Sequence, residues 1–124
     1  MPVYTVFTEN YLTPIQKKRI SKKITDLHST VTNVPSELIT VLFRSGFHLE
    51  KDYELIISGI LRTGGNRTDS MFKTLGIALV NELSQVIAID QNKIHWDFLE
   101  VKAKWVFGRG AVLPSPGEEA QCCK

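Results

Sequence analysis

The sequence predicts an α+β fold in which two β-α-β units build one four-stranded, mostly parallel or mixed sheet with both helices on one face. β-branched and aromatic residues gather in four short segments, and apolar residues at helical spacing fill two longer ones. These segments run strand, helix, strand, and then strand, helix, strand again, in halves of similar length. The predicted strands are 3–8, 38–44, 53–61 and 94–99, and the predicted helices are about 14–30 and 69–88.

The first unit begins with a strand at the start of the chain. All residues from Val3 to Phe7 are β-branched or aromatic, which suits a packed, pleated position. The helix that follows opens on Thr13-Pro14-Ile15-Gln16, where Thr13 is the predicted N-cap, Pro14 takes the first helical position and Gln16 completes a capping box. Its buried stripe is expected to contain Ile20, Ile24, Leu27 and Val31.

The second unit starts from an apolar strand that contains Leu55-Ile56-Ile57. A glycine-rich turn from Arg62 to Arg67 leads into a helix capped by Thr68 or Asp69. Glycine and proline are frequent from Lys102 onward, so the tail is expected to be irregular, with one short strand around 105–107. The buried stripe of the second helix is expected to contain Phe72, Leu75, Leu79, Leu83, Val86 and Ile87.

The connections predict how the strands pair. Each unit is expected to cross over right-handedly, which makes its two strands a parallel pair. Two helices suffice to cover only one face of such a sheet, so the other face has to be buried by another subunit. The 124 residues are enough for one domain with a real core, and residues 1–124 are expected to form a single domain.

Composition and charge exclude several classes of protein. The net charge of +2 is too small to indicate a nucleic-acid partner, and the basic run 17–23 is interpreted as a solvated helix face. No apolar run approaches the roughly 18 residues of a membrane span, and no secretory leader is visible. The only cysteines, Cys122 and Cys123, are neighbours and make no disulfide framework. The expectation is a cytoplasmic protein with no nucleic-acid or membrane partner.

Pro2 is the first candidate for chemistry. If Met1 is removed, the Pro2 nitrogen becomes a secondary amine held at the lip of the sheet, because the strand begins at once. An ordinary terminal amine titrates at roughly 7.7–8.0, and one that is fixed and partly desolvated can move a proton near neutral pH. The alternative is that Pro2 does no more than permit the removal of Met1.

Two arginines and a histidine are the candidates for binding. Arg67 directly precedes a helix, whose first N–H groups favour an anion, so Arg62 and Arg67 are a candidate carboxylate clamp. The alternative is two solvated loop arginines. His28 follows Ile24 by one turn and borders the buried stripe, either as a boundary residue or as a group that points into a cleft. The Gly64-Gly65 turn lacks the G-K-[ST] ending of a phosphate-binding loop, and neither a metal nor a cofactor is expected.

Several stretches resemble the tautomerase superfamily: Met1-Pro2-Val3-Tyr4, Leu12-Thr13-Pro14, and Ile24-Thr25-Asp26 with His28. Within it, the chain is most similar to the cis-chloroacrylic acid dehalogenase branch, and the Ile89-Asp90 turn and the tail from Leu113 to Gly117 also match. The resemblance covers almost the whole chain. It implies a tautomerase-like fold with two β-α-β units, a homotrimer, and the amino-terminal proline in the active site.

The resemblance also assigns roles to single residues. Pro2 matches the catalytic proline, and His28 matches a histidine that helps hold the substrate. Arg62 and Arg67 match the two carboxylate-binding arginines, but two extra residues separate them in this chain. Two positions depart from the dehalogenase pattern, where a tyrosine is replaced by Asp97 and the glutamate that activates water by Gly108. Asp97 either orients a water or is a surface residue on an alternating strand, and we favour the surface residue.

The function that these residues imply is a cofactor-independent tautomerase. Pro2 would move a proton to or from carbon in a small carboxylate-bearing enol, keto or unsaturated acid, with the carboxylate held by Arg62, Arg67 and His28. Dehalogenation or hydration like that of the cis-chloroacrylic acid dehalogenases is the second hypothesis. The third is a non-catalytic trimeric binding module, which retention of Met1 would support.

Overall fold

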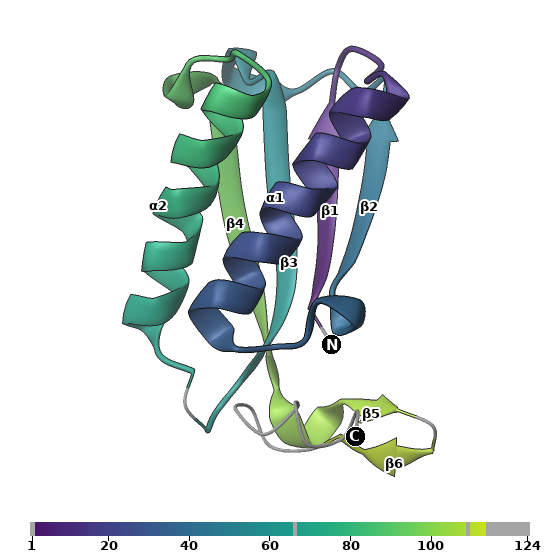
Figure 1. Cartoon of the computed structure of the whole chain (residues 1–124), viewed down its shortest axis with the longest axis vertical. Coiled ribbons are helices and arrows are strands. Elements are labelled where there is room, and N and C mark those ends of the chain that lie inside the picture. Colours follow the sequence, from purple (N-terminus) through teal and green to yellow (C-terminus); the bar gives the residue numbers. More distant parts are fainter. Residues whose placement is uncertain (1, 66, 109, 114–124) are drawn as a thin grey trace.

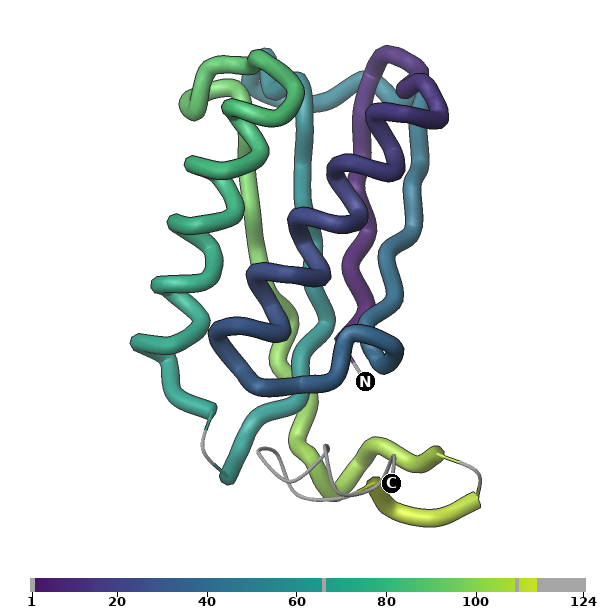
Figure 2. Tube along the Cα trace, in the orientation of Figure 1, coloured from purple at the N-terminus to yellow at the C-terminus, as the bar shows by residue number. Residues whose placement is uncertain are grey.

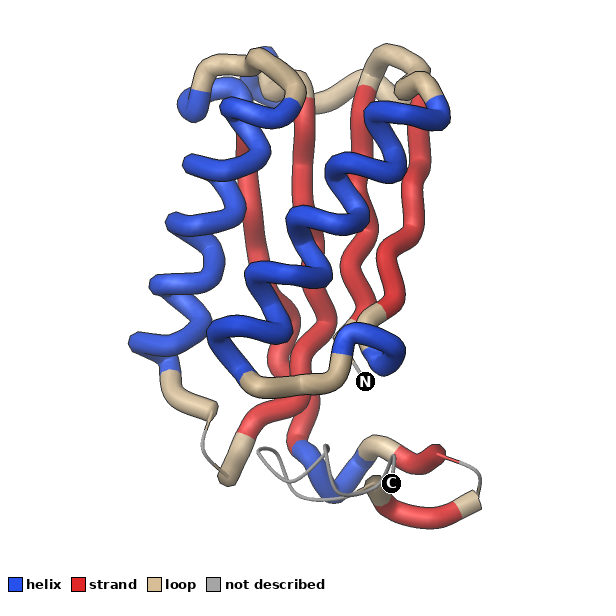
Figure 3. The backbone as a smooth tube through the Cα atoms, in the orientation of Figure 1, coloured by secondary structure: helices blue, strands red, loops and turns tan. Residues whose placement is uncertain are grey.

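In the computed structural model, which describes residues 2–65, 67–108 and 110–113, two helices lie side by side on one face of a four-stranded sheet (Figures 1 and 3). A short two-stranded hairpin, β5–β6, projects beyond one end of this sheet (Figure 1). The elements are β1 (Val3–Thr8), α1 (Pro14–Thr32), β2 (Thr40–Ser45), β3 (Leu55–Thr63), α2 (Asp69–Val86), β4 (Ile94–Lys102), β5 (Phe107–Gly108) and β6 (Ala111–Val112).

The four-stranded sheet has the order β2-β1-β3-β4. β1 and β2 are parallel, β3 and β4 are parallel, and the two central strands β1 and β3 are antiparallel, with Tyr4 opposite Gly59. Each parallel pair is the product of one β-α-β unit. The prediction of two such units that form a mixed sheet with both helices on one face is therefore confirmed.

Some predicted boundaries are wrong. Residues Ser36–Leu38 form a 3₁₀ turn, so β2 begins at Thr40 and not at residue 38. β3 extends to Thr63, which places Arg62 in a strand and not in the glycine-rich turn. β4 likewise continues to Lys102, because β3 and β4 pair without interruption from Leu55–Ile94 to Thr63–Lys102. This long-range pairing overrides the local signals that suggested earlier ends.

Side chains cap both helices at their first turns. The Thr13 hydroxyl accepts from the Gln16 N–H (3.1 Å) and the Gln16 side chain accepts from the Thr13 N–H (2.9 Å), so the predicted capping box is confirmed. Of the two predicted caps for α2, Thr68 is the one present, and its hydroxyl accepts from the Met71 N–H at 3.1 Å. Asn33 ends α1 in the left-handed conformation, with φ of 62°.

The core lies between the helices and the sheet. Alternate residues of β1 and β3 face the helices, and Gly76 lets α2 approach β4 closely, since a Cβ there would lie 2.5 Å from the Trp96 ring. No helix of the described residues combines the length and the apolar character needed to cross a membrane. The buried core consists of Tyr4, Val6, Ile20, Ile24, Leu55, Ile57, Leu61, Phe72, Leu75, Leu79, Leu83 and Ile94.

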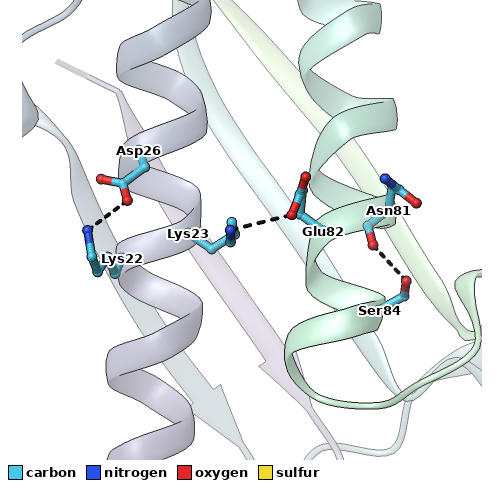
Figure 4. A network of polar contacts seen from close by, with 6 residues as sticks. All are labelled: Lys22, Lys23, Asp26, Asn81, Glu82 and Ser84. Carbon is cyan, nitrogen blue, oxygen red and sulfur yellow. Dashed lines mark hydrogen bonds and ion pairs between the residues drawn. The ribbon is translucent and has the colours of Figure 1, made fainter.

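Polar side chains of the two helices form contacts on the outer surface of the helix layer (Figure 4). Lys23 of α1 pairs with Glu82 of α2 at 3.4 Å, and Lys22 pairs with Asp26 one turn on at 2.8 Å. Both pairs are substantially exposed, so each contributes little to stability. Lys22 and Lys23, from the basic run 17–23, therefore lie on a solvated helix face, as predicted, and form ion pairs there.

The other face of the sheet carries exposed apolar side chains. Ile60 of β3 and Leu99 of β4 are neighbours in register, and Leu42 lies on the same face of β2. Their exposed fractions are 43%, 61% and 50%. Exposed apolar side chains on one face of a sheet are typical of a surface that another chain covers.

The β5–β6 hairpin lies at the end of the sheet where β1 begins (Figures 1 and 2). The short strand predicted around 105–107 is present but begins later, at Phe107, because residues Ala103–Trp105 form a 3₁₀ turn, and it pairs with a second short strand that was not predicted. Trp105, Phe107 and Val112 are exposed. The tail from Pro114, with Cys122 and Cys123, lies outside the described residues.

Candidate active site

Four of the five residues singled out in the sequence line one small pocket: Pro2, His28, Arg62 and Arg67. They come from the position before β1, the last turns of α1, the end of β3 and the segment before α2, which all meet at one end of the sheet (Figure 2). The cavity is only about 10 Å³ in the isolated chain, roughly the room for one water molecule. The remaining wall consists of Val34, Leu61 and Phe72.

Pro2 is buried and is held by backbone pairing. It directly precedes β1, an inner strand with neighbours on both sides. The Thr40 N–H donates to the Pro2 carbonyl at 3.1 Å, so the β1–β2 ladder reaches back to this residue. The hydrogen-bond ladder of the sheet thereby holds Pro2 at the pocket.

The two arginines are brought together by a glycine turn. Gly64 and Gly65 have φ of 103° and 58°, a region that glycine enters without steric cost. The Arg67 N–H donates to the Gly64 carbonyl at 3.1 Å, which closes the turn and returns the chain toward β3. Arg62 is 6% exposed and Arg67 is partly buried. The two additional residues between them are therefore compatible with both side chains lining one pocket.

His28 is buried, with 3% of its surface exposed, and its Nδ1 lies 2.6 Å from the Tyr4 hydroxyl. Burial, then the positive charge of Arg67, then that of the amino terminus, lower the pKa of His28 to about 3. Burial also raises the pKa of Tyr4 well above its usual range. At neutral pH both groups are uncharged.

The electrostatics of the pocket favour an anion. Two guanidinium groups, which remain protonated at any physiological pH, line it with a neutral imidazole. Planar guanidinium groups suit a carboxylate, which they can bind through paired hydrogen bonds. Among the described residues, no group of three or more His, Cys, Asp and Glu side chains is placed to hold a metal ion.

The fifth candidate, Asp97, lies away from the pocket. It is exposed on the face of β4 opposite the helices, accepts from the Ser58 hydroxyl at 2.8 Å and pairs with His95 at 3.4 Å. Gly108 is in β5, where a Cβ would lie 2.5 Å from the Leu113 side chain. Tyr4, which contacts His28 without lining the pocket, was not singled out from the sequence as a functional residue, since a tyrosine in a strand is most simply a core residue.

No protein-family model matches the sequence, and no curated protein is significantly similar to it. Solved structures are similar in fold. One is N1, a member of the cis-3-chloroacrylic acid dehalogenase family, at 18% identity over 97% of this chain and 89% of that one, with a TM-score of 0.82. Another is the asymmetric trimer of the R7 fused 4-OT, at 13% identity over 98% and 99%, with a TM-score of 0.78. A third is Pt0534 inactivated by 2-oxo-3-pentynoate, at 15% identity over 89% and 95%, with a TM-score of 0.73.

The chain has the fold of these proteins. The similarity extends over nearly the full length of both partners in each comparison, so it includes all four strands and both helices. The fold implied by the sequence resemblance is confirmed. At 13–18% identity, the similarity establishes the fold alone.

The low pKa of His28 predicts a pH dependence of stability. In the unfolded chain the imidazole titrates near 6.5, and in the folded chain near 3, so the unfolded state binds more protons between these values. The free energy of unfolding should therefore fall as the pH drops from about 6.5 toward 3, by at most about 5 kcal/mol from this group.

Urea titrations between pH 7 and pH 4 check this prediction. The variant His28→Gln, which keeps a polar side chain without the titration, should lose less stability over this range than the unmodified protein. His48→Gln serves as the control, because that imidazole is 92% exposed. Equal slopes for His28→Gln and the unmodified protein would contradict the prediction.

Proposed function

We propose that the protein is a cofactor-independent enzyme of the tautomerase superfamily that uses the amine of Pro2, after removal of Met1, as acid and base. The observation that carries this proposal is the pocket that Pro2 shares with Arg62 and Arg67. A buried, immobile amine beside two fixed positive charges is suited to proton transfer on a bound anion. The substrate class is a small carboxylate-bearing enol, keto or unsaturated acid.

The proposed reaction is an isomerisation that needs no second substrate. Arg62 and Arg67 bind the carboxylate, and His28 contributes a further hydrogen bond. The neutral Pro2 amine removes the hydroxyl proton of the enol, and the carbonyl forms as electron density moves to the neighbouring carbon. The resulting ammonium then returns a proton to that carbon. Burial and the two arginines act against the protonated amine, so the neutral form is available to start the cycle.

The similar structures support this substrate class. Pt0534 is inactivated by 2-oxo-3-pentynoate, which is an unsaturated 2-oxo acid. A compound of that class carries the carboxylate that a pair of arginines would bind. Hydration or dehalogenation has less support, because Asp97 lies on the opposite face of the sheet and Gly108 has no side chain that could activate water.

We also propose that the protein is a homotrimer. Ile60, Leu99 and Leu42 leave an apolar sheet face exposed in the single chain, and a similar structure, the R7 fused 4-OT, is a trimer. Sedimentation equilibrium should report about three chains. Ile60→Asp should reduce the mass toward that of one chain, since it places a charge in the proposed interface. Ile15→Asp, at an exposed apolar position on α1, should leave it unchanged. A monomeric unmodified protein would contradict the proposal.

The role of Pro2 is tested by Pro2→Ala, which keeps a terminal amine but makes it primary and more mobile. With an enol such as that of phenylpyruvate, kcat should fall by roughly one to three orders of magnitude. The ionisation in the pH–rate profile should also shift. Intact mass must show that Met1 is absent from both proteins, because an acylated proline nitrogen has no free lone pair. Unchanged kcat and ionisation, or a retained Met1 in the unmodified protein, would favour the binding module.

The role of Arg67 is tested by Arg67→Ala with an acid substrate and with its ester. The variant should raise KM strongly for the acid and little for the ester, because the lost ion pair requires the negative charge. Arg62→Ala should behave similarly. Arg19→Ala, which removes an exposed arginine from α1, is the matched control. Equal losses on acid and ester would show that Arg67 supports the structure and not the substrate.

A further inference from the structure

Behind the pocket, a completely buried tyrosine contacts the histidine. Tyr4 has no exposed surface, and its hydroxyl lies 2.6 Å from Nδ1 of His28. The two rings meet edge to face, with centroids 5.5 Å apart and planes at 82°. A contact this short, inside the core, joins the first strand to the penultimate turn of α1.

The proton in this hydrogen bond can be assigned from its surroundings. Among the described residues, the Tyr4 hydroxyl has no other hydrogen-bond partner than His28. A buried O–H has to donate, because an unsatisfied buried donor is costly, and Nδ1 is its only acceptor. A neutral imidazole that accepts at Nδ1 carries its proton on Nε2. The opposite tautomer would point two protons at one another or leave the phenol proton unsatisfied.

We propose that Tyr4 is a positioning residue that holds His28 as the neutral Nε2–H tautomer, so that the imidazole donates a hydrogen bond to an oxygen of the bound substrate. The hydrogen bond from His28 to the substrate rests on the proposed function. The tautomer itself follows from Tyr4 and His28 alone. Tyr4 does not line the pocket, so it acts through His28.

The fold makes room for this tyrosine. Gly59 lies opposite Tyr4 in the β1–β3 register, and a Cβ at Gly59 would come within 3.1 Å of the Tyr4 ring and 2.8 Å of Phe98. Phe98 packs against Tyr4 edge to face, with centroids 6.2 Å apart and planes at 81°. The Tyr4 ring is therefore held in place by close packing, which fixes the position of its hydroxyl.

The helix fixes the other partner. The Thr32 hydroxyl donates to the His28 carbonyl at 2.7 Å, and Asn33 closes α1 in the left-handed conformation. Both ends of the Tyr4–His28 hydrogen bond are thus held by rigid elements. With Nδ1 occupied, Nε2 is the ring nitrogen that remains for a ligand, and it offers a proton and not a lone pair. His28 then binds substrates that present an oxygen acceptor, such as the carbonyl or carboxylate of a 2-oxo acid, and leaves proton abstraction to Pro2.

Long-range ¹H–¹⁵N NMR of the ligand-free protein tests the tautomer directly. At pH 7, the His28 nitrogens should show an unprotonated Nδ1 and a protonated Nε2. In Tyr4→Phe, which retains the ring and removes the hydroxyl, this signature should be lost in favour of a mixture of tautomers. A protonated Nδ1 in the unmodified protein, or the same signature in Tyr4→Phe, would overturn the proposal. If Tyr4→Phe does not fold, the spectrum of the unmodified protein still decides the tautomer.

Kinetics then test whether the hydrogen bond from Tyr4 to His28 affects the turnover of substrate. Tyr4→Phe should lower kcat/KM for a 2-oxo acid by about tenfold, the loss expected for one oriented hydrogen bond. In the His28→Gln background, where the amide has no tautomer to select, Tyr4→Phe should have much less effect. Tyr53→Phe is the matched control, since Tyr53 stacks on His95 at 5.2 Å with no hydrogen bond between them among those described. Additive losses for Tyr4→Phe and His28→Gln would overturn the positioning role.

The two measurements separate this inference from the proposed function. An Nε2–H signature that depends on Tyr4, in a protein that turns over no acid, would support the tautomer assignment and contradict the proposed enzyme. Activity together with a protonated Nδ1 would contradict the role of Tyr4 and leave the enzyme standing.

Discussion

The pairing of β1 on both of its edges is the constraint on which the site depends. β2 lies on one side and β3 on the other, and the ladder begins at Pro2, whose carbonyl accepts from Thr40. Residues two apart in a strand lie on the same face. Pro2 and Tyr4 therefore both face the helix layer, where the end of α1 presents His28. If β1 lost its pairing with its neighbours, the proposed catalytic amine of Pro2 and the Tyr4 side chain would both lose their fixed positions.

Local signals predicted the elements well because their causes are local. The capping box at Thr13 and Gln16 and the cap at Thr68 each involve residues three apart, and both are present. The end of β3 could not be predicted in this way. Arg62 precedes a glycine pair that suggests a turn, yet its backbone pairs with Val101, nearly forty residues later in the chain. Pairings of that kind depend on the whole sheet and leave no mark in the neighbouring sequence.

The candidate site was predictable to the extent that its residues stand out chemically. Each pocket residue was a candidate for its own local reason. Pro2 precedes a strand, Arg62 and Arg67 flank a glycine pair, and His28 borders an apolar stripe. All four line one pocket. Alternation along β4 favoured a surface position for Asp97, where it lies. Tyr4 could not be predicted as a functional residue from its neighbours in β1. Its partner, His28, is 24 residues away on α1, so the local sequence makes Tyr4 look like any core aromatic residue.

The chemistry of Tyr4 is well matched to a site that binds anions. A carboxylate at this position would orient His28 equally well, but it would favour the imidazolium form and offset one of the arginines. The buried phenol keeps its proton, since burial raises its pKa, and so it orients the ring without adding charge. His28 stays neutral beside Arg67, and the positive charges of the two arginines remain available to the ligand. An uncharged pair behind two cations is therefore the arrangement that orients a donor without weakening the attraction for a carboxylate.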